Sequence, residues 1–128
     1  MEKITTEDIA NLNTVWELPK NKKPIVIIGA GGIVSDAHLP AYQKANFPIR
    51  GIYDPDKEKA KKCAEIYSIE KIYSSEEEAL EEKDVVFDIA VPPQVLLSIV
   101  EKIPANSICQ LQKPMGNSMD DAKKIRNI

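Results

Sequence analysis

The sequence has little of what several classes of protein depend on. Its two cysteines, Cys63 and Cys109, are too few and too far apart for a disulfide scaffold or a zinc site. Its single histidine, His38, lacks the partners that a metal site or a catalytic triad needs. No apolar run approaches the roughly 20 residues of a membrane span, and the first residues show no secretion signal. A net charge of −3 without a basic stripe disfavours nucleic acid. We therefore expect a cytoplasmic protein with no metal, no nucleic-acid partner and no membrane association.

The composition is that of a globular protein, with 43% hydrophobic and 29% charged residues among 128. This length suits one domain with a proper core. Residues 1–23 are predicted to be an N-terminal extension, with a short helix over Thr6–Leu12 and a charged linker over Pro19–Pro24. Residues 24–128 are predicted to form the domain.

From residue 24 onward, short apolar strands alternate with amphipathic helices. The predicted strands are Ile25–Ile28, Ile49–Tyr53, Lys71–Tyr73, Val85–Val91 and Ser107–Leu111. The first predicted helix follows the glycines and ends at about Asn46, with a kink or a late start at Pro40. The second covers Asp56–Tyr67, with Cys63 in the core, and the third begins at a capping box of Ser75 and Glu78. The fourth covers Val95–Ile103, and the last begins at Ser118. This alternation indicates an α/β fold with a doubly wound parallel sheet. Because the last helix stops at Ile128 without a cap glycine or a turn, we expect the chain to be truncated.

A glycine-rich turn separates the first predicted strand from its helix. Glycine at positions 29 and 31 lets the backbone turn tightly and approach a diphosphate, and Gly32 follows. The first N–H groups of the helix would then bind phosphate oxygens. Val34 stands where the usual pattern has Gly or Ala for close helix–strand packing, so we expect the helix to be pushed slightly outward. No Gly-Lys-Ser/Thr follows the glycines, which excludes a kinase-type phosphate-binding loop. The alternative is a tight turn without a ligand.

An aspartate, Asp54, ends the second predicted strand, about 20 positions after Val34. A carboxylate there can accept hydrogen bonds from both ribose hydroxyls of adenosine. The alternative is a turn aspartate before Pro55. A 2′-phosphate about 4 Å away would be repelled by about 1–4 kcal/mol, and Arg50 and Lys57 could offset part of this. We therefore expect NAD, with NADP as the weaker candidate.

Four stretches carry a more specific pattern. They are GAGGIVSDAHLPAY (29–42), IYDPDKEKA (52–60), IAVPP (89–93) and LQKPMG (111–116). In this order and spacing they resemble the Gfo/Idh/MocA oxidoreductases, the relatives of glucose–fructose oxidoreductase and inositol dehydrogenase. The resemblance implies a Rossmann domain that binds NAD(P). In the family an α/β domain with an open antiparallel sheet follows, supplies substrate contacts and often forms the oligomer interface. That domain and the sixth Rossmann strand are absent from this sequence.

The resemblance also implies roles for individual residues. Lys113 matches the lysine of the family's Glu-Lys-Pro motif, beside the nicotinamide and the substrate hydroxyl, where it can act as a catalytic proton carrier. Gln112 replaces the motif's glutamate and removes a negative partner. Gln94 stands near the position where many relatives have a histidine. His38 matches the His-Leu-Pro of the family's first helix, and we interpret it as a structural residue that borders the cofactor. The residues expected to contact the cofactor are Gly29, Gly31, Gly32, Ile33, Val34, Asp54, Val91, Pro92, Pro93, Gln94 and Lys113.

The leading hypothesis is therefore hydride transfer between NAD(H) and a polyol or sugar-like alcohol by the full-length protein. This chain alone is expected to be inactive. One alternative is a non-catalytic dinucleotide sensor or interaction module, which Gln112 and the missing histidine favour. A methyltransferase is a third hypothesis, but apolar Ile27 and Ile33 stand where those enzymes usually have an acid and a glycine.

Overall fold

The computed structural model describes residues 3–12, 15 and 17–128. Its centre is a wholly parallel sheet with the strand order β2-β1-β3-β4. The strands are β1 (Ile25–Ile28), β2 (Ile49–Tyr53), β3 (Val86–Ile89) and β4 (Ile108–Leu111). The helices are α1 (Thr6–Ala10), η1 (Val34–His38), α2 (Leu39–Lys44), α3 (Lys57–Tyr67), α4 (Glu76–Leu80), α5 (Pro93–Val100) and α6 (Met119–Arg126).

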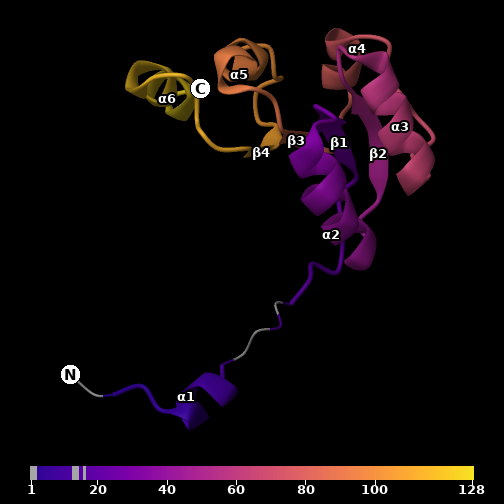
Figure 1. Ribbon diagram of the computed structural model, residues 1–128. Helices are drawn as coiled ribbons and strands as arrows, with labels where there is room; N and C mark the ends of the chain where they lie inside the picture. The colour runs from indigo at the N-terminus through magenta and orange to yellow at the C-terminus, as the bar shows by residue number, and fades with distance from the viewer. Residues whose placement is uncertain (1–2, 13–14, 16) are drawn as a thin grey trace.

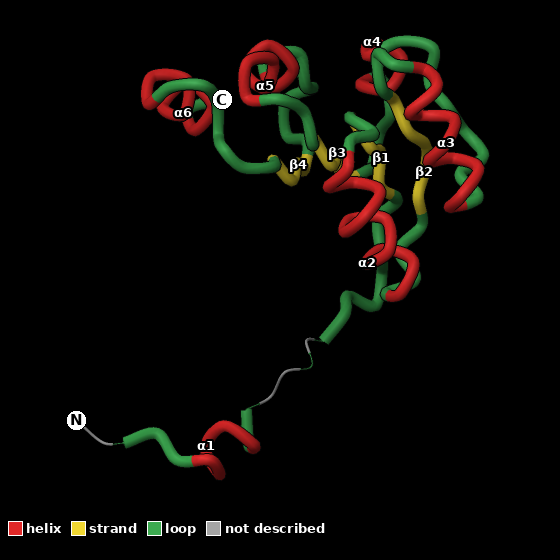
Figure 2. Tube along the Cα trace, in the orientation of Figure 1, coloured by secondary structure: helices red, strands yellow, loops and turns green. Residues whose placement is uncertain are grey.

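Helices cover both faces of the sheet (Figures 1 and 2). Every residue of β1 is buried, because this central strand is packed on both sides. Ile25 and Ile27 pack with residues of η1, α2 and α3, whereas Val26 and Ile28 pack with residues of α4, α5 and α6. The two clusters are the two layers of a doubly wound sheet, as the sequence predicted. Helix α1 lies apart from this domain in both figures.

The predicted strand over Lys71–Tyr73 forms only a single bridge, between Ile52 and Ile72. Two backbone hydrogen bonds make this bridge, from Ile52 N–H to Lys71 O and from Tyr73 N–H to Ile52 O. Pairing stops there because the chain turns at once into α4, whose N-cap is Ser75. The segment thus lies where a fifth strand would, on the outer side of β2.

The helix after the glycine turn begins with a wide turn, as the proline in it predicted. The N–H of Leu39 donates to Val34 O, five residues earlier, which makes η1 a π-helical turn. Because Pro40 has no N–H, regular α-helical bonding resumes only in α2.

Most of the remaining local predictions agree with the structure. Cys63 is buried in the core on α3. The Ser75 hydroxyl caps α4 by accepting from Glu78 N–H, but the Glu78 carboxylate bonds the N–H and hydroxyl of Ser74 instead of closing the box on Ser75. None of the helices in the described part of the chain combines the length and apolarity needed to cross a bilayer.

Candidate functional site

A cleft of about 460 Å³ opens at the carboxyl ends of β1, β2 and β3. Ligands of open α/β sheets bind at this edge, where the strand order reverses. The residues that line it are Ile28, Gly29, Gly31, Tyr53, Asp54, Pro55, Asp56, Lys59, Glu76, Ala90, Val91, Pro92, Val95, Ser98 and Ile99. The glycine turn, the aspartate and the first of the two prolines thus share one cleft.

The glycines of the turn serve different purposes. Gly29 has φ +103°, and a Cβ on it would lie 2.3 Å from the carbonyl oxygen of Ala90. It is required by the fold itself, since it lets β1 end against the segment that follows β3. A Cβ on Gly31, in contrast, would have no neighbour within 4 Å. None of the described residues requires glycine there, so the space above it is free for a ligand.

Asp54 faces the glycine turn across the cleft. Its Oδ2 accepts from Ala30 N–H at 2.7 Å, and its Oδ1 accepts from Asp56 N–H at 2.8 Å. These bonds fix the carboxylate beside the turn. Each oxygen keeps a further lone pair for a hydroxyl donor. The fixed carboxylate and the open space above Gly31 fit the ribose and diphosphate of a dinucleotide.

The lining of this cleft is acidic. The carboxylates of Asp54, Asp56 and Glu76 line it, against the single ammonium group of Lys59. Burial raises the pKa of Tyr53, and the nearby Glu76 carboxylate raises it further, so this phenol stays neutral. Such a lining disfavours an extra phosphate group on a ligand.

Several residues expected at the cofactor lie outside this cleft. Val34 is fully buried among the residues of the α2 and α3 face, so it contributes packing at the start of η1. Ile33 is 46% exposed on the same turn. Gly32, Pro93, Gln94 and Lys113 are also absent from the lining of the cleft.

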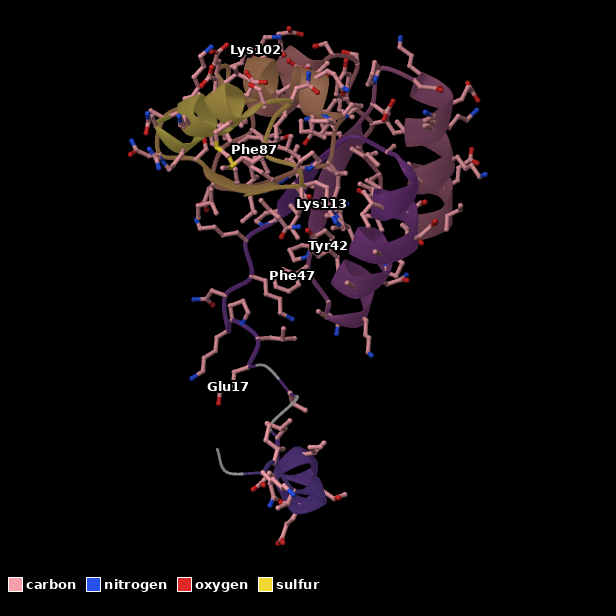
Figure 3. The ribbon with its side chains drawn as sticks, turned by 60° about the vertical axis from the view of Figure 1, so that its left-hand side comes forward. Glu17, Tyr42, Phe47, Phe87, Lys102 and Lys113 are labelled. Atoms are coloured by element: carbon pink, nitrogen blue, oxygen red, sulfur yellow. The ribbon has the colours of Figure 1, made fainter. Side chains whose placement is uncertain are left out.

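Lys113 lies beyond the end of β4, with its backbone N–H bonded to Gln112 Oε1 at 2.7 Å. The Gln112 amide nitrogen lies 3.3 Å from His38 Nε2, and His38 Nδ1 lies 2.8 Å from Asp88 Oδ2. Tyr42 donates to the same Asp88 oxygen at 2.8 Å. Figure 3 labels Tyr42 and Lys113, two residues of this network.

Comparison with known proteins identifies the domain. The family described as "Oxidoreductase family, NAD-binding Rossmann fold", Gfo/Idh/MocA, matches residues 23–128. The chain belongs to this family. It is 33% identical over 108 residues to "Uncharacterized protein YMR315W" of Saccharomyces cerevisiae, covering 80% of this chain and 31% of that protein.

Solved Gfo/Idh/MocA-like structures share the fold. An oxidoreductase from Thermotoga maritima matches with a TM-score of 0.75 and 25% identity, over 82% of this chain and 34% of its own. A myo-inositol dehydrogenase from Lactobacillus casei, in complex with NAD(H) and myo-inositol, matches with a TM-score of 0.76 and 18% identity, over 84% of this chain and 33% of its own. The chain therefore spans about a third of the length of these relatives. It is a nucleotide-binding domain of the oxidoreductase type.

Within this Gfo/Idh/MocA domain, sequence reasoning missed the network behind Lys113. Asp88 carried a signal, because it is a charged residue inside an apolar strand, and it is fully buried. Tyr42 and Gln110 carried none, since their contact joins residues 68 positions apart. The register of β3 on β4, which sets Asp88 beside Gln110, brings these residues together.

Proposed function

We propose that the cleft binds NAD, with the diphosphate over residues 29–33 and the adenosine ribose on Asp54. One observation carries this proposal: the open space above Gly31 and the fixed carboxylate of Asp54 line the same cleft. The backbone N–H groups at the start of the helix, which have no intrahelical acceptor, would bind the phosphate oxygens. Residues 24–128 form the binding domain in this proposal, and residues 1–23 are an extension.

The acidic lining supports NAD over NADP. A 2′-phosphate on the ribose would lie close to Asp54, and Asp56 and Glu76 line the same cleft. At about 4 Å the repulsion from one carboxylate is about 1–4 kcal/mol. Lys59 is the one cation of the lining, so it compensates only part of this.

We further propose that the full-length protein oxidises a small-molecule substrate, a polyol or a sugar-like alcohol. The bound nicotinamide would accept the hydride. Lys113 would hold the alcohol oxygen and take its proton, while Val91, Pro92, Pro93 and Gln94 form the rim beside the nicotinamide ribose. The name of the Lactobacillus casei relative, which holds NAD(H) and myo-inositol, supports this substrate class. Since this chain spans a third of its relatives, we expect it to bind the cofactor but not to turn over substrate. The same proposal places the protein in the cytoplasm, with any oligomer formed through a further domain.

Calorimetric titration of the chain with NAD and with NADP tests the cofactor. We expect binding of NAD at least about tenfold tighter than binding of NADP, the equivalent of about 1.4 kcal/mol. Asp54→Asn should weaken NAD binding about tenfold or more, because a charge-assisted hydrogen bond is worth about 1.5–3 kcal/mol. Glu65→Gln, which removes the same charge from an exposed position on α3, is the matched control and should bind as the wild type does. Tighter binding of NADP than of NAD would contradict the proposal.

A non-catalytic dinucleotide module is the second candidate function. The observation that favours it is Gln112, which removes a carboxylate beside Lys113, and Lys113 forms no ion pair within the described residues. A substrate-dependent rise in the absorbance of the reduced nicotinamide, measured with a full-length protein, decides between the two. Membership in an oxidoreductase family argues against the methyltransferase alternative.

A further inference from the structure

The side chains behind Lys113 form a hydrogen-bond chain whose directions can be deduced. A backbone N–H can only donate, so the bond from Lys113 N–H fixes Gln112 Oε1 as its acceptor. The NH₂ group of Gln112 therefore faces His38, at 3.3 Å from Nε2. An amide nitrogen only donates, so His38 Nε2 must be the unprotonated, accepting nitrogen of the ring.

The other end of the hydrogen-bond chain indicates the same protonation of His38. Gln110 Nε2 donates to the Tyr42 oxygen at 3.2 Å, which leaves the Tyr42 hydroxyl proton for Asp88 Oδ2. Asp88 Oδ2 is then an acceptor for both Tyr42 and His38 Nδ1, at 2.8 Å each. His38 thus carries its single proton on Nδ1.

Asp88 is well placed to hold this arrangement. Its side chain is fully buried, and its other oxygen, Oδ1, has no hydrogen-bond partner within the described residues. The carboxyl group therefore depends on the two donors at Oδ2, and losing either would leave this buried group with a single hydrogen bond. Such a site favours the ring tautomer that donates from Nδ1.

We propose that Asp88 fixes His38 in the Nδ1–H tautomer, and that this tautomer turns the Gln112 amide so that its oxygen holds the backbone of Lys113. Asp88, His38 and Gln112 are positioning residues in this relay. Its value for catalysis rests on the proposed function, in which Lys113 holds the substrate oxygen. The relay also accounts for Gln112. A glutamate at this position offers only acceptors, so it would require a proton on Nε2 as well and would make the ring an imidazolium.

Nitrogen-15 NMR of the imidazole tests the relay directly in the 128-residue chain. His38 is the only histidine, so its ring signals need no residue assignment, and couplings to the ring C–H protons distinguish Nδ1 from Nε2. At mildly alkaline pH, where a free imidazole is neutral, we expect Nδ1 to be protonated and Nε2 to be bare. The opposite pattern in the wild-type chain would overturn the proposal.

Two substitutions at Asp88 test the first step. Asp88→Leu removes the acceptor, so the ring should move to the Nε2–H tautomer. The Gln112 amide should then turn, and hydrogen exchange at the Lys113 N–H should accelerate about fivefold, as the loss of one ordinary hydrogen bond predicts. Asp88→Asn still offers an oxygen and should retain the wild-type tautomer. An unchanged tautomer in Asp88→Leu, or a changed tautomer with unchanged exchange at Lys113, would refute the relay.

A substitution of the half-buried Gln112 provides a second test if Asp88→Leu fails to fold. Gln112→Glu should leave both ring nitrogens protonated at neutral pH, whereas Gln43→Glu, an equal charge change at an exposed position of α2, should not. A bare Nε2 in Gln112→Glu would count against the relay. All these readings use the ligand-free chain, so failure of NAD to bind would disprove the proposed function and leave the relay standing. Normal NAD binding with a proton on Nε2 instead of Nδ1 would disprove the relay and leave the proposed function standing.

Discussion

At the scale of single residues, two glycines of one turn should respond differently to the same substitution. Gly31→Ala should leave the free energy of unfolding within about 0.5 kcal/mol of the wild type, because its Cβ enters open space. The same methyl group would occupy the space proposed for the diphosphate, so NAD affinity should fall at least about tenfold. Urea unfolding and calorimetric titration of the variant measure the two effects.

Gly29→Ala is the informative contrast. Its Cβ would collide with the Ala90 carbonyl oxygen, and its φ of +103° is unfavourable for alanine. We expect a loss of stability of about 2–4 kcal/mol. If Gly31→Ala were destabilised as much as Gly29→Ala, glycine at position 31 would be explained by the fold alone, and the argument for a ligand there would fail.

At the scale of elements, a tyrosine holds the segment outside β2 in place. Tyr73 is buried, its ring lies over Gly51, and its hydroxyl donates to Glu82 Oε1 at 3.0 Å. Tyr73→Phe should keep the ring packing and lose this bond, which lowers the free energy of unfolding by about 1 kcal/mol. Urea unfolding measures the change, and hydrogen exchange at Tyr73 N–H shows whether the loosening is local. A variant as stable as the wild type would mean that packing alone fixes the segment.

The same segment shows how far pattern reasoning reaches at this scale. The strands at Ile25–Ile28 and Ile49–Tyr53 were predicted with the bounds that the structure has. The first of them is a continuous apolar run, which identifies a buried strand. Segment 71–73 was predicted as a strand, but the extent of its pairing depends on Gly51 of β2 and on the start of α4, which the local pattern of the segment does not contain.

At the scale of the whole molecule, the fold class and the cleft could be predicted because both follow from short sequence spacings. The glycine turn and Asp54 lie one strand–helix–strand unit apart, so chain order alone brings them together at the sheet edge. The network of Asp88, His38 and Gln112 could not be predicted in this way. It joins residues from three separate segments, and only the placement of His38 at the end of η1 beside Asp88 of β3 and Gln112 after β4 sets their distances.

The stability of the whole domain should also depend on pH. Hydrogen bonds from Lys71 hold the pKa of Glu82 below its ordinary value of 4.5. Bonds from Ser74 do the same for Glu78, and those from Lys23 do so for Asp84. A carboxyl group with a lowered folded-state pKa stabilises the protein above its unfolded-state pKa, and this contribution is lost as the pH falls through the folded-state value. The free energy of unfolding should therefore be nearly flat from neutral pH to about pH 5 and decline below about pH 4.5.

Glu82→Gln separates one carboxylate from this general decline. At neutral pH the variant should be less stable by about 1 kcal/mol, because Lys71 and Tyr73 lose a charged acceptor. As the pH falls, wild-type Glu82 becomes protonated and loses the same advantage, so the two curves of unfolding free energy against pH should converge. Urea unfolding of both chains at a series of pH values tests this. A constant difference down to the acid limit would mean that Glu82 acts through packing, since only a titrating interaction can disappear with pH.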